Sequence, residues 1–198
     1  MNKTLKLHLA CGDVYLKDYI NIDIIGEYVS DYMNRTKSKI NPNETTIDNY
    51  FKFPWQQDRS KRKARPFIID KKMNILKRWQ FASNSVSEIV MINAIEHFNK
   101  NTEILYIINE AYRVLETNGI FKFDFPNIRR IVTKYYDKNP EFCMELIYCN
   151  HKNKYSIHKW GYTLKSIKNY FNPKLWQLKF KQVVKHDYPS TGCWAIKL

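Results

Sequence analysis

The stretch Leu5-Lys-Leu-His-Leu-Ala-Cys-Gly-Asp13, followed after a short link by Ile20-Asn-Ile-Asp23, decides the fold. Leucines alternate with polar residues in its first half, which is the period-two pattern of a β-strand. This strand ends at small residues, and Gly12 can adopt a positive φ without steric cost. Isoleucines at alternate positions predict a second strand, with Asp23 near its carboxyl end.

A carboxylate at that end can accept hydrogen bonds from the two hydroxyls of a ribose. The pattern therefore indicates a nucleoside site at the edge of an open α/β sheet, formed by the loop around Gly12 and by Asp23. A buried strand pair with an ordinary turn explains the same residues, because a glycine-poor loop is a weak fingerprint. On this stretch alone, both interpretations stay open.

Length and composition predict one domain over residues 1–198, because 44% of the residues are hydrophobic and can bury a core. We expect no membrane contact, since no apolar run approaches the roughly 18 residues of a membrane span. We expect no secretory signal, since residues 1–6 lack an apolar segment. The four cysteines form no C-x-x-C pair, which argues against zinc; we expect no metal site and a reduced, cytoplasmic protein.

Positive charge suggests a further class of partner. The net charge of +14 is typical of proteins that bind nucleic acid, although the lysines are scattered along the chain. The dense basic cluster comprises Arg59, Lys61, Arg62, Lys63 and Arg65. It is consistent with a solvated loop or with a phosphate-binding patch. It ends a polar stretch, residues 26–65, that is longer than a usual strand-to-strand link and predicts an insertion near the ligand.

The rest of the chain predicts alternating strands and helices, and therefore a largely parallel sheet with right-handed crossovers. We expect strands at residues 66–70, 87–93 and 120–125, a helix from about 102 to 115 stopped by Asn118-Gly119, helices within 128–150 broken at Pro140, a short helix from Thr163 to about 171, and an antiparallel hairpin of residues 178–187 and 193–198.

Four blocks of sequence occur in a characteristic order between about residues 5 and 171. They are Leu7-His-Leu-Ala-Cys-Gly-Asp13 with Tyr19-Ile-Asn-Ile-Asp23; Phe81-Ala-Ser-Asn-Ser-Val-Ser-Glu-Ile-Val90 with Ala94-Ile-Glu-His97; Arg113-Val-Leu-Glu-Thr-Asn-Gly119 with Phe123-Asp-Phe-Pro126; and His158-Lys-Trp-Gly-Tyr-Thr163. Together they resemble the class I S-adenosylmethionine-dependent methyltransferases. The resemblance implies an α/β fold with a Rossmann-like, mostly parallel seven-stranded sheet, helices on both faces and a C-terminal antiparallel hairpin.

The same resemblance implies S-adenosylmethionine as cofactor and assigns the residues around it. The methionine part would be bordered by Ala10, Cys11 and Gly12, and the ribose would be bound by Asp23. The adenine would lie near Asp70 or its neighbour Lys71, and the sulfonium would lie above Asn93 and Ala94. One departure is the alanine at position 10, where the family usually has glycine; its methyl group narrows the loop, which is consistent either with an active enzyme or with a non-catalytic relative.

Methyl transfer from a sulfonium needs alignment and exclusion of water, and a base only where the acceptor is a hydroxyl or a protonated amine. His158 is the first candidate base, because the loop before the last helix usually faces the acceptor in this family. His97 is the second, because it follows the fourth predicted strand at the ligand edge. Each histidine also has a purely structural explanation, as a residue that braces a helix start or packs on Trp160.

Three hypotheses about function follow. The leading one is a methyltransferase acting on a hydroxyl of a small molecule or glycan. The second is an RNA or DNA methyltransferase that uses the basic cluster at residues 59–65. The third is a non-catalytic, methyltransferase-like binding subunit, suggested by the alanine at position 10.

Overall fold

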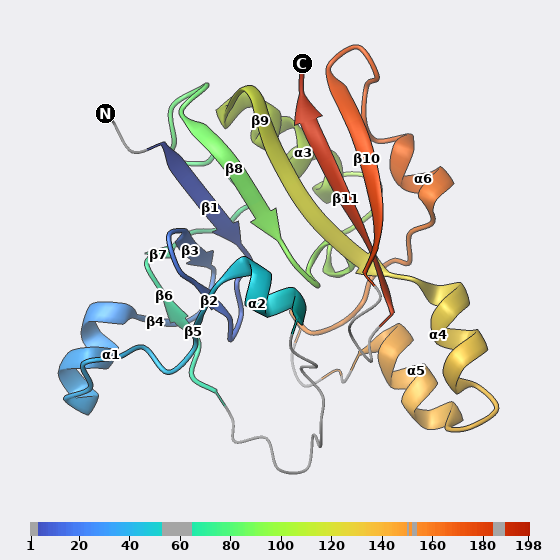
Figure 1. Cartoon of the computed structure of the whole chain (residues 1–198), viewed down its shortest axis with the longest axis horizontal. Coiled ribbons are helices and arrows are strands. Elements are labelled where there is room, and N and C mark those ends of the chain that lie inside the picture. Colours follow the sequence, from blue (N-terminus) through green and yellow to red (C-terminus); the bar gives the residue numbers. More distant parts are fainter. Residues whose placement is uncertain (1–3, 53–64, 150, 152–153, 184–188) are drawn as a thin grey trace.

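The computed structural model describes residues 4–52, 65–149, 151, 154–183 and 189–198. Its main sheet has seven strands in the order β10-β11-β9-β8-β1-β3-β7 (Figure 1). The strands are β1 (Leu5–Leu9), β3 (Ile20–Asp23), β7 (Lys71–Lys72), β8 (Val86–Met91), β9 (Leu115–Pro126), β10 (Trp176–Val183) and β11 (Ser190–Lys197). The prediction of a mostly parallel, Rossmann-like α/β sheet is confirmed, because the strands from β7 to β9 pair in parallel.

The predicted C-terminal antiparallel hairpin is confirmed as the pair β10–β11. Cys193 of β11 lies opposite Phe180 of β10 on one side and opposite Phe123 of β9 on the other. β11 is thus inserted between β9 and β10 and runs antiparallel to both. Residues 184–187, which the prediction included in the hairpin, lie outside the described residues.

One face of the sheet contributes to the main hydrophobic core. Leu7 and Leu9 of β1 are fully buried there. The helix α3 (Glu103–Val114) packs on the same face through an apolar stripe with the period of an α-helix: Ile104, Ile107, Ile108, Ala111 and Val114. Strand and helix thereby bury complementary apolar surfaces, as layered α/β folds require.

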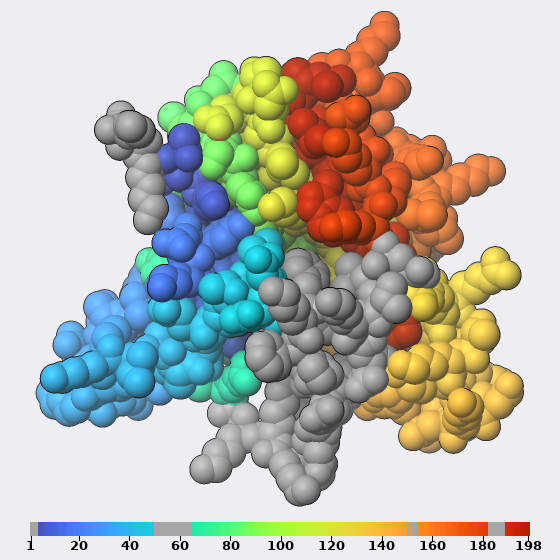
Figure 2. Space-filling model, viewed as in Figure 1, coloured from blue at the N-terminus to red at the C-terminus, as the bar shows by residue number. Residues whose placement is uncertain are grey.

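The opposite face is covered only in part. The helix α2 (Ile47–Lys52) packs Ile47 against the small cluster that contains Val90 of β8, so helices lie on both faces as predicted. Elsewhere the strands β1, β8, β9, β11 and β10 come to the surface side by side (Figure 2). This face carries half-buried polar groups: the Glu88 carboxylate accepts hydrogen bonds from Lys122 Nζ at 2.8 Å and from the Tyr19 hydroxyl at 2.5 Å.

Helices follow β9 as predicted, and the second of them begins at Pro140. They are α4 (Ile128–Tyr135), α5 (Pro140–Tyr148) and α6 (Leu164–Lys168). Pro140 fits the first turn of α5, where its missing N–H costs nothing. Thr163 caps α6 in a capping box with Ser166, and α6 ends at Lys168, short of the predicted residue 171.

The stretch 26–65 contains regular structure that the sequence pattern did not predict. The helix α1 (Val29–Thr36) lies there, together with α2. Two small parallel sheets pair β2 (Tyr15–Leu16) with β5 (Glu44–Thr45), and β4 (Glu27–Tyr28) with β6 (Ile68–Ile69). None of the residues of α1 is buried, so the helix lacks the apolar stripe from which it could be recognised.

One predicted strand is divided in the structure, and one predicted helix stop is misplaced. The strand expected at residues 66–70 is divided into β6, which pairs with β4, and β7, which pairs with β3 at the edge of the main sheet. The helix expected at about residues 102–115 is confirmed as α3, but Asn118-Gly119, its predicted stop, lies beyond the end of the helix at Val114. Asn118 does adopt a left-handed conformation, with φ 65°, but it lies within β9 near a register shift against β8, which is the position of a bulge.

Four residues of the predicted basic cluster, Arg59, Lys61, Arg62 and Lys63, lie outside the described residues, so a phosphate-binding patch there stays a prediction. In the part of the chain that the structure describes, no helix has both the length and the apolar character that crossing a bilayer demands.

Candidate functional site

A cavity opens at the carboxyl edge of the main sheet, where the strand order reverses at β1. β3 and β7 lie on one side of β1, and β8 lies on the other. Ligands in open α/β sheets bind at such a reversal. The cavity has a volume of about 860 Å³ and is lined by the loops after β1, β3, β7 and β8 and by several residues between 149 and 159. This size falls within the range of roughly 300–1,000 Å³ found for small-molecule sites.

Asp23 joins the loops that follow β1 and β3. Its Oδ2 accepts a hydrogen bond from the Gly12 N–H at 2.9 Å, and its Oδ1 accepts from the N–H groups of Ile24 and Ile25 at 2.7 and 3.2 Å. A carboxylate has about four acceptor positions, so these three bonds leave one on Oδ2. Since Asp23 also lines the cavity, that remaining position can accept a hydroxyl hydrogen from a ligand.

The loop after β1 has the shape of a cradle for a ligand. Gly12 has φ +55°, and a Cβ added there would meet nothing within 4 Å, so the missing side chain leaves open space. Ala10 has φ 49° and Asn93, after β8, has φ 47°, both in the left-handed region that non-glycine residues seldom adopt. All three residues line the cavity. Unusual backbone conformations therefore gather where two parallel strands end beside the cavity.

Several solved structures with the same architecture are described as S-adenosylmethionine-dependent methyltransferases. A SAM-dependent methyltransferase from Methanosarcina mazei matches with a TM-score of 0.55 and 15% identity, covering 100% of this chain and 94% of that chain. A putative one from Listeria monocytogenes gives 0.53 and 11%, covering 100% and 91%. One from Aquifex aeolicus gives 0.51 and 13%, covering 99% and 83%. The chain has the class I methyltransferase fold.

No family model matches the sequence. No curated protein is significantly similar to it either. In the comparisons, the methyltransferase fold is thus supported by the arrangement of strands and helices and not by overall sequence similarity.

Two of the residues predicted to contact the cofactor do not line the cavity of this methyltransferase fold. Cys11 is buried, and burial raises the pKa of its thiol. Asp70 accepts hydrogen bonds from the backbone N–H and side-chain amide of Asn21, at 2.8 and 3.0 Å, and from the Tyr15 hydroxyl at 2.5 Å. These contacts brace β3 against the segment between β6 and β7. The residues that line the cavity after β7 are instead Met73, Asn74, Ile75 and Leu76.

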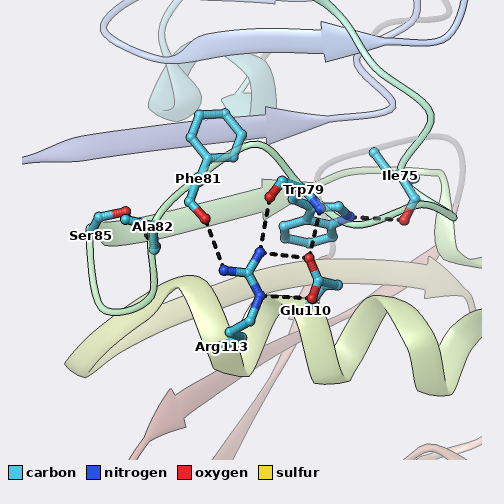
Figure 3. A network of polar contacts seen from close by, with 7 residues as sticks. All are labelled: Ile75, Trp79, Phe81, Ala82, Ser85, Glu110 and Arg113. Carbon is cyan, nitrogen blue, oxygen red and sulfur yellow. Dashed lines mark hydrogen bonds and ion pairs between the residues drawn. The ribbon is translucent and has the colours of Figure 1, made fainter.

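The loop that carries Met73–Leu76 is fixed to α3 by a partly buried polar network (Figure 3). The Arg113 guanidinium binds both carboxylate oxygens of Glu110 at 2.7–2.8 Å and donates to the carbonyls of Trp79 and Phe81 at 3.0 and 2.9 Å. Glu110 in turn accepts from the Trp79 N–H at 2.7 Å, and the Trp79 indole N–H donates to the Ile75 carbonyl at 2.9 Å. Sequence reasoning used Arg113 only as part of a motif and missed this role.

The two predicted bases, His97 and His158, lie side by side with their ring centroids 4.7 Å apart. His97 follows β8 in the short 3₁₀ helix η2 (Ile95–His97) and lines the cavity. His158 does not line it, and its Nε2 faces Glu96 Oε1 at 3.8 Å. Glu96 was part of a motif but received no predicted role. Glu96 and His97 therefore lie next to His158, which comes from a distant segment of the chain.

Burial sets the charge of these groups. It lowers the pKa of His97 to about 4, with a further contribution from the adjacent His158, and it lowers the pKa of His158. Burial and the nearby Asp124 charge raise the pKa of Glu96 well above its usual value. Both imidazoles are consequently neutral near pH 7, and their lowered pKa values make them weak bases for a free hydroxyl.

Proposed function

We propose that this protein is a S-adenosylmethionine-dependent methyltransferase that acts on a hydroxyl of a small molecule or glycan. The observation that carries the proposal is the arrangement of Gly12 and Asp23 at the edge of a cavity of about 860 Å³. The free acceptor position on Asp23 suits a ribose hydroxyl, and the space beside Gly12 suits a ligand that approaches the backbone closely. When bound, the cofactor supplies a methyl group already activated on a sulfonium.

This chain's own residues would then bind and align the reactants. Asp23 fixes the nucleoside end of the site, and Asn93 and Ala94 form the wall after β8. The Asn93 turn is held by a hydrogen bond from its N–H to Asp124 Oδ1 at 2.7 Å. Alignment of this kind supplies much of the rate in displacement reactions, because it removes the entropic cost of bringing reactants together.

Calorimetry with S-adenosylhomocysteine tests the proposal. We expect measurable binding to the wild type and a loss of at least about tenfold in affinity, equivalent to 1.4 kcal/mol, in Asp23→Asn. Asp70→Asn provides the comparison, because Asp70 also accepts backbone and side-chain hydrogen bonds but does not line the cavity. We expect its affinity to stay close to that of the wild type. Absence of binding to the wild type would refute the proposal and support a non-catalytic subunit.

A nucleic-acid acceptor is the second candidate, favoured by the net charge of +14. Protein–nucleic acid affinity falls steeply with salt when many phosphates are contacted. We therefore expect, under this alternative, salt-dependent binding of an RNA or DNA oligonucleotide that weakens when the residues of the 59–65 cluster are changed to glutamine. Salt-independent or absent binding would leave the small-molecule or glycan acceptor.

A further inference from the structure

Two histidines and one glutamate form a compact set of potential metal ligands beside the cavity. One ligand atom each from Glu96, His97 and His158 lies within 4.8 Å of the others. Neutral imidazoles and carboxylates are the ligands of many zinc, iron, manganese and cobalt sites, and two histidines with one carboxylate leave further coordination positions open. The composition of the set is therefore that of a divalent-metal site.

Hydrogen bonds to main-chain carbonyls fix the tautomer of both rings. His97 Nδ1 lies 3.1 Å from the Ile157 carbonyl oxygen, and His158 Nδ1 lies 2.9 Å from that of Ile147. A carbonyl oxygen can only accept, so each Nδ1 must carry the hydrogen. The lone pair of each ring is consequently on Nε2. Metal-binding histidines are usually oriented in this way, with the other ring nitrogen donating to a carbonyl or carboxylate.

Glu96 supplies the second, independent observation. Glu96 is 1% exposed, and neither of its carboxylate oxygens has a hydrogen-bond partner among the described residues. A buried carboxylate without partners is costly, and among the described residues the bare Nε2 of His158 faces Glu96 Oε1 at 3.8 Å. Two nitrogen lone pairs and an ionised Glu96 carboxylate would repel one another, and a cation between them would satisfy all three.

The backbone holds the ligands close to the arrangement that such a cation needs. The Glu96 carbonyl accepts hydrogen bonds from the N–H groups of Lys159 and Trp160 at 2.8 and 3.2 Å, which ties the segment of His158 to η2. Ligand atoms about 2.1 Å from a metal lie about 3.4 Å apart in a tetrahedral site. Since the ligand atoms lie within 4.8 Å of one another, each pair must approach by at most about 1.4 Å on binding.

We propose that Glu96, His97 and His158 bind one divalent transition-metal ion or zinc at the wall of the cavity. The open coordination positions would take oxygen ligands, either water or a hydroxyl of a bound molecule. Because His97 lines the cavity, such a hydroxyl would enter from there. A metal ion lowers the pKa of an oxygen ligand, and this effect would compensate for the weak basicity of the two histidines. The compensation rests on the proposed methyl transfer, but the binding of the metal does not depend on that proposal. The prediction of no metal site was based only on the spacing of the cysteines and did not take these three residues into account.

Metal titration of chelator-treated protein tests the site directly. We expect about one equivalent of Co²⁺ to bind, with the visible absorption bands of a low-symmetry cobalt site, and Zn²⁺ to displace it. Mg²⁺ should bind much more weakly, because it prefers an all-oxygen octahedral shell. Equilibrium dialysis with elemental analysis measures the stoichiometry without any reference to activity.

Substitutions decide where the metal binds. Each of Glu96→Gln, His97→Gln and His158→Gln should weaken Co²⁺ binding at least about 100-fold, since even partners of the ligands contribute 10–100-fold. His151→Gln is the matched control, because His151 is an exposed histidine outside the set and its variant should bind like the wild type. Circular dichroism and thermal unfolding without metal confirm that each variant folds. Glu96→Gln preserves the size of the side chain and removes only the carboxylate, so we expect it to fold.

Failure of this inference is distinguishable from failure of the proposed function. Substoichiometric Co²⁺ binding to the wild type, or undiminished binding in the folded Glu96→Gln and His158→Gln variants, would overturn the metal site and point to a bridging water or a protonated Glu96. S-adenosylhomocysteine binding is measured on the same preparations. Its absence, with metal binding retained, would overturn the methyltransferase proposal alone.

Discussion

The Arg113 guanidinium offers the sharpest test of what holds the cavity wall in place. It donates hydrogen bonds to both oxygens of Glu110 and to the carbonyls of Trp79 and Phe81 (Figure 3). The loop that it anchors begins with the cavity-lining segment Met73–Leu76. We expect Arg113→Met to lower the free energy of unfolding and also to weaken ligand binding in the cavity, because both depend on this anchor.

The magnitude follows from burial. The side chains of Arg113 and Glu110 are 21% and 12% exposed, so the pair lies between a surface ion pair and a fully buried one. Breaking a fully buried pair costs about 3–5 kcal/mol, whereas exposed pairs contribute about 0–1 kcal/mol. The two bonds to main-chain carbonyls add about 1 kcal/mol each. Methionine preserves most of the apolar stem packing, so we expect a total loss of about 3 kcal/mol.

The protein contains a matched control for this change. Arg35 binds Glu27 with the same bidentate geometry, at 2.7 and 2.8 Å, but the side chains are 62% and 31% exposed, and the structure gives Arg35 no bond to a main-chain carbonyl of a described residue. Arg35→Met should therefore change stability little. A difference between the two variants measures the contribution of burial and of the carbonyl contacts, since the ion-pair geometry is held constant.

Urea unfolding measures both free energies, and calorimetry with S-adenosylhomocysteine measures the effect on the cavity. A double-mutant cycle with Glu110→Gln should give a coupling of about 1–3 kcal/mol with Arg113→Met. Equal effects of Arg113→Met and Arg35→Met would refute the reasoning. So would a large loss of stability in Arg113→Met with ligand affinity unchanged, because the loop would then not depend on its anchor.

Two further predictions concern the first strand and its loop. Burial lowers the pKa of His8 to about 4 from 6.5, so its neutral form is favoured in the fold. The resulting contribution to the free energy of unfolding is about 3 kcal/mol; it is complete above about pH 6.5 and is lost as the pH falls toward 4. Urea unfolding near pH 7 and pH 4.5 should therefore show a smaller loss of stability at the lower pH in His8→Gln than in the wild type. Ala10→Gly should be nearly neutral, because relief of the left-handed φ of 49° offsets the lost methyl contact. Ala10→Val should instead cost more than about 2 kcal/mol in the same assay; equal stability of the two variants would contradict a strained loop.

Local sequence pattern was sufficient for the parts of the site that neighbouring residues determine. Alternating leucines and isoleucines define β1 and β3, and a parallel pair must bring their carboxyl ends to one edge. Gly12 and Asp23 therefore meet as the pattern predicted, with the Gly12 N–H bonded to the Asp23 carboxylate. No information from distant parts of the chain was needed for this contact.

Contacts between residues that are distant in the sequence could not be predicted from the local sequence pattern. The wall formed by Met73–Leu76 depends on Arg113, whose partners Trp79 and Phe81 lie more than 30 residues away in the chain. The family resemblance instead implied Asp70, the acid that ends a predicted strand, but that side chain is engaged by Asn21 and Tyr15. Proximity to a strand end could not distinguish a structural carboxylate from one that faces the cavity.

The turn after β8 connects the two halves of the site. Asn93 lies there with a left-handed backbone, and the buried Asp124 of β9 holds its N–H at 2.7 Å. Asn93 and Ala94 line the cavity, and Glu96 and His97 follow directly in η2. The separation between the Asp23 edge and the Glu96–His97–His158 set is thus determined largely by one short turn. Methyl transfer in line with a breaking carbon–sulfur bond tolerates little error in that separation, so a strained turn held by a buried carboxylate is an arrangement that such a reaction would require.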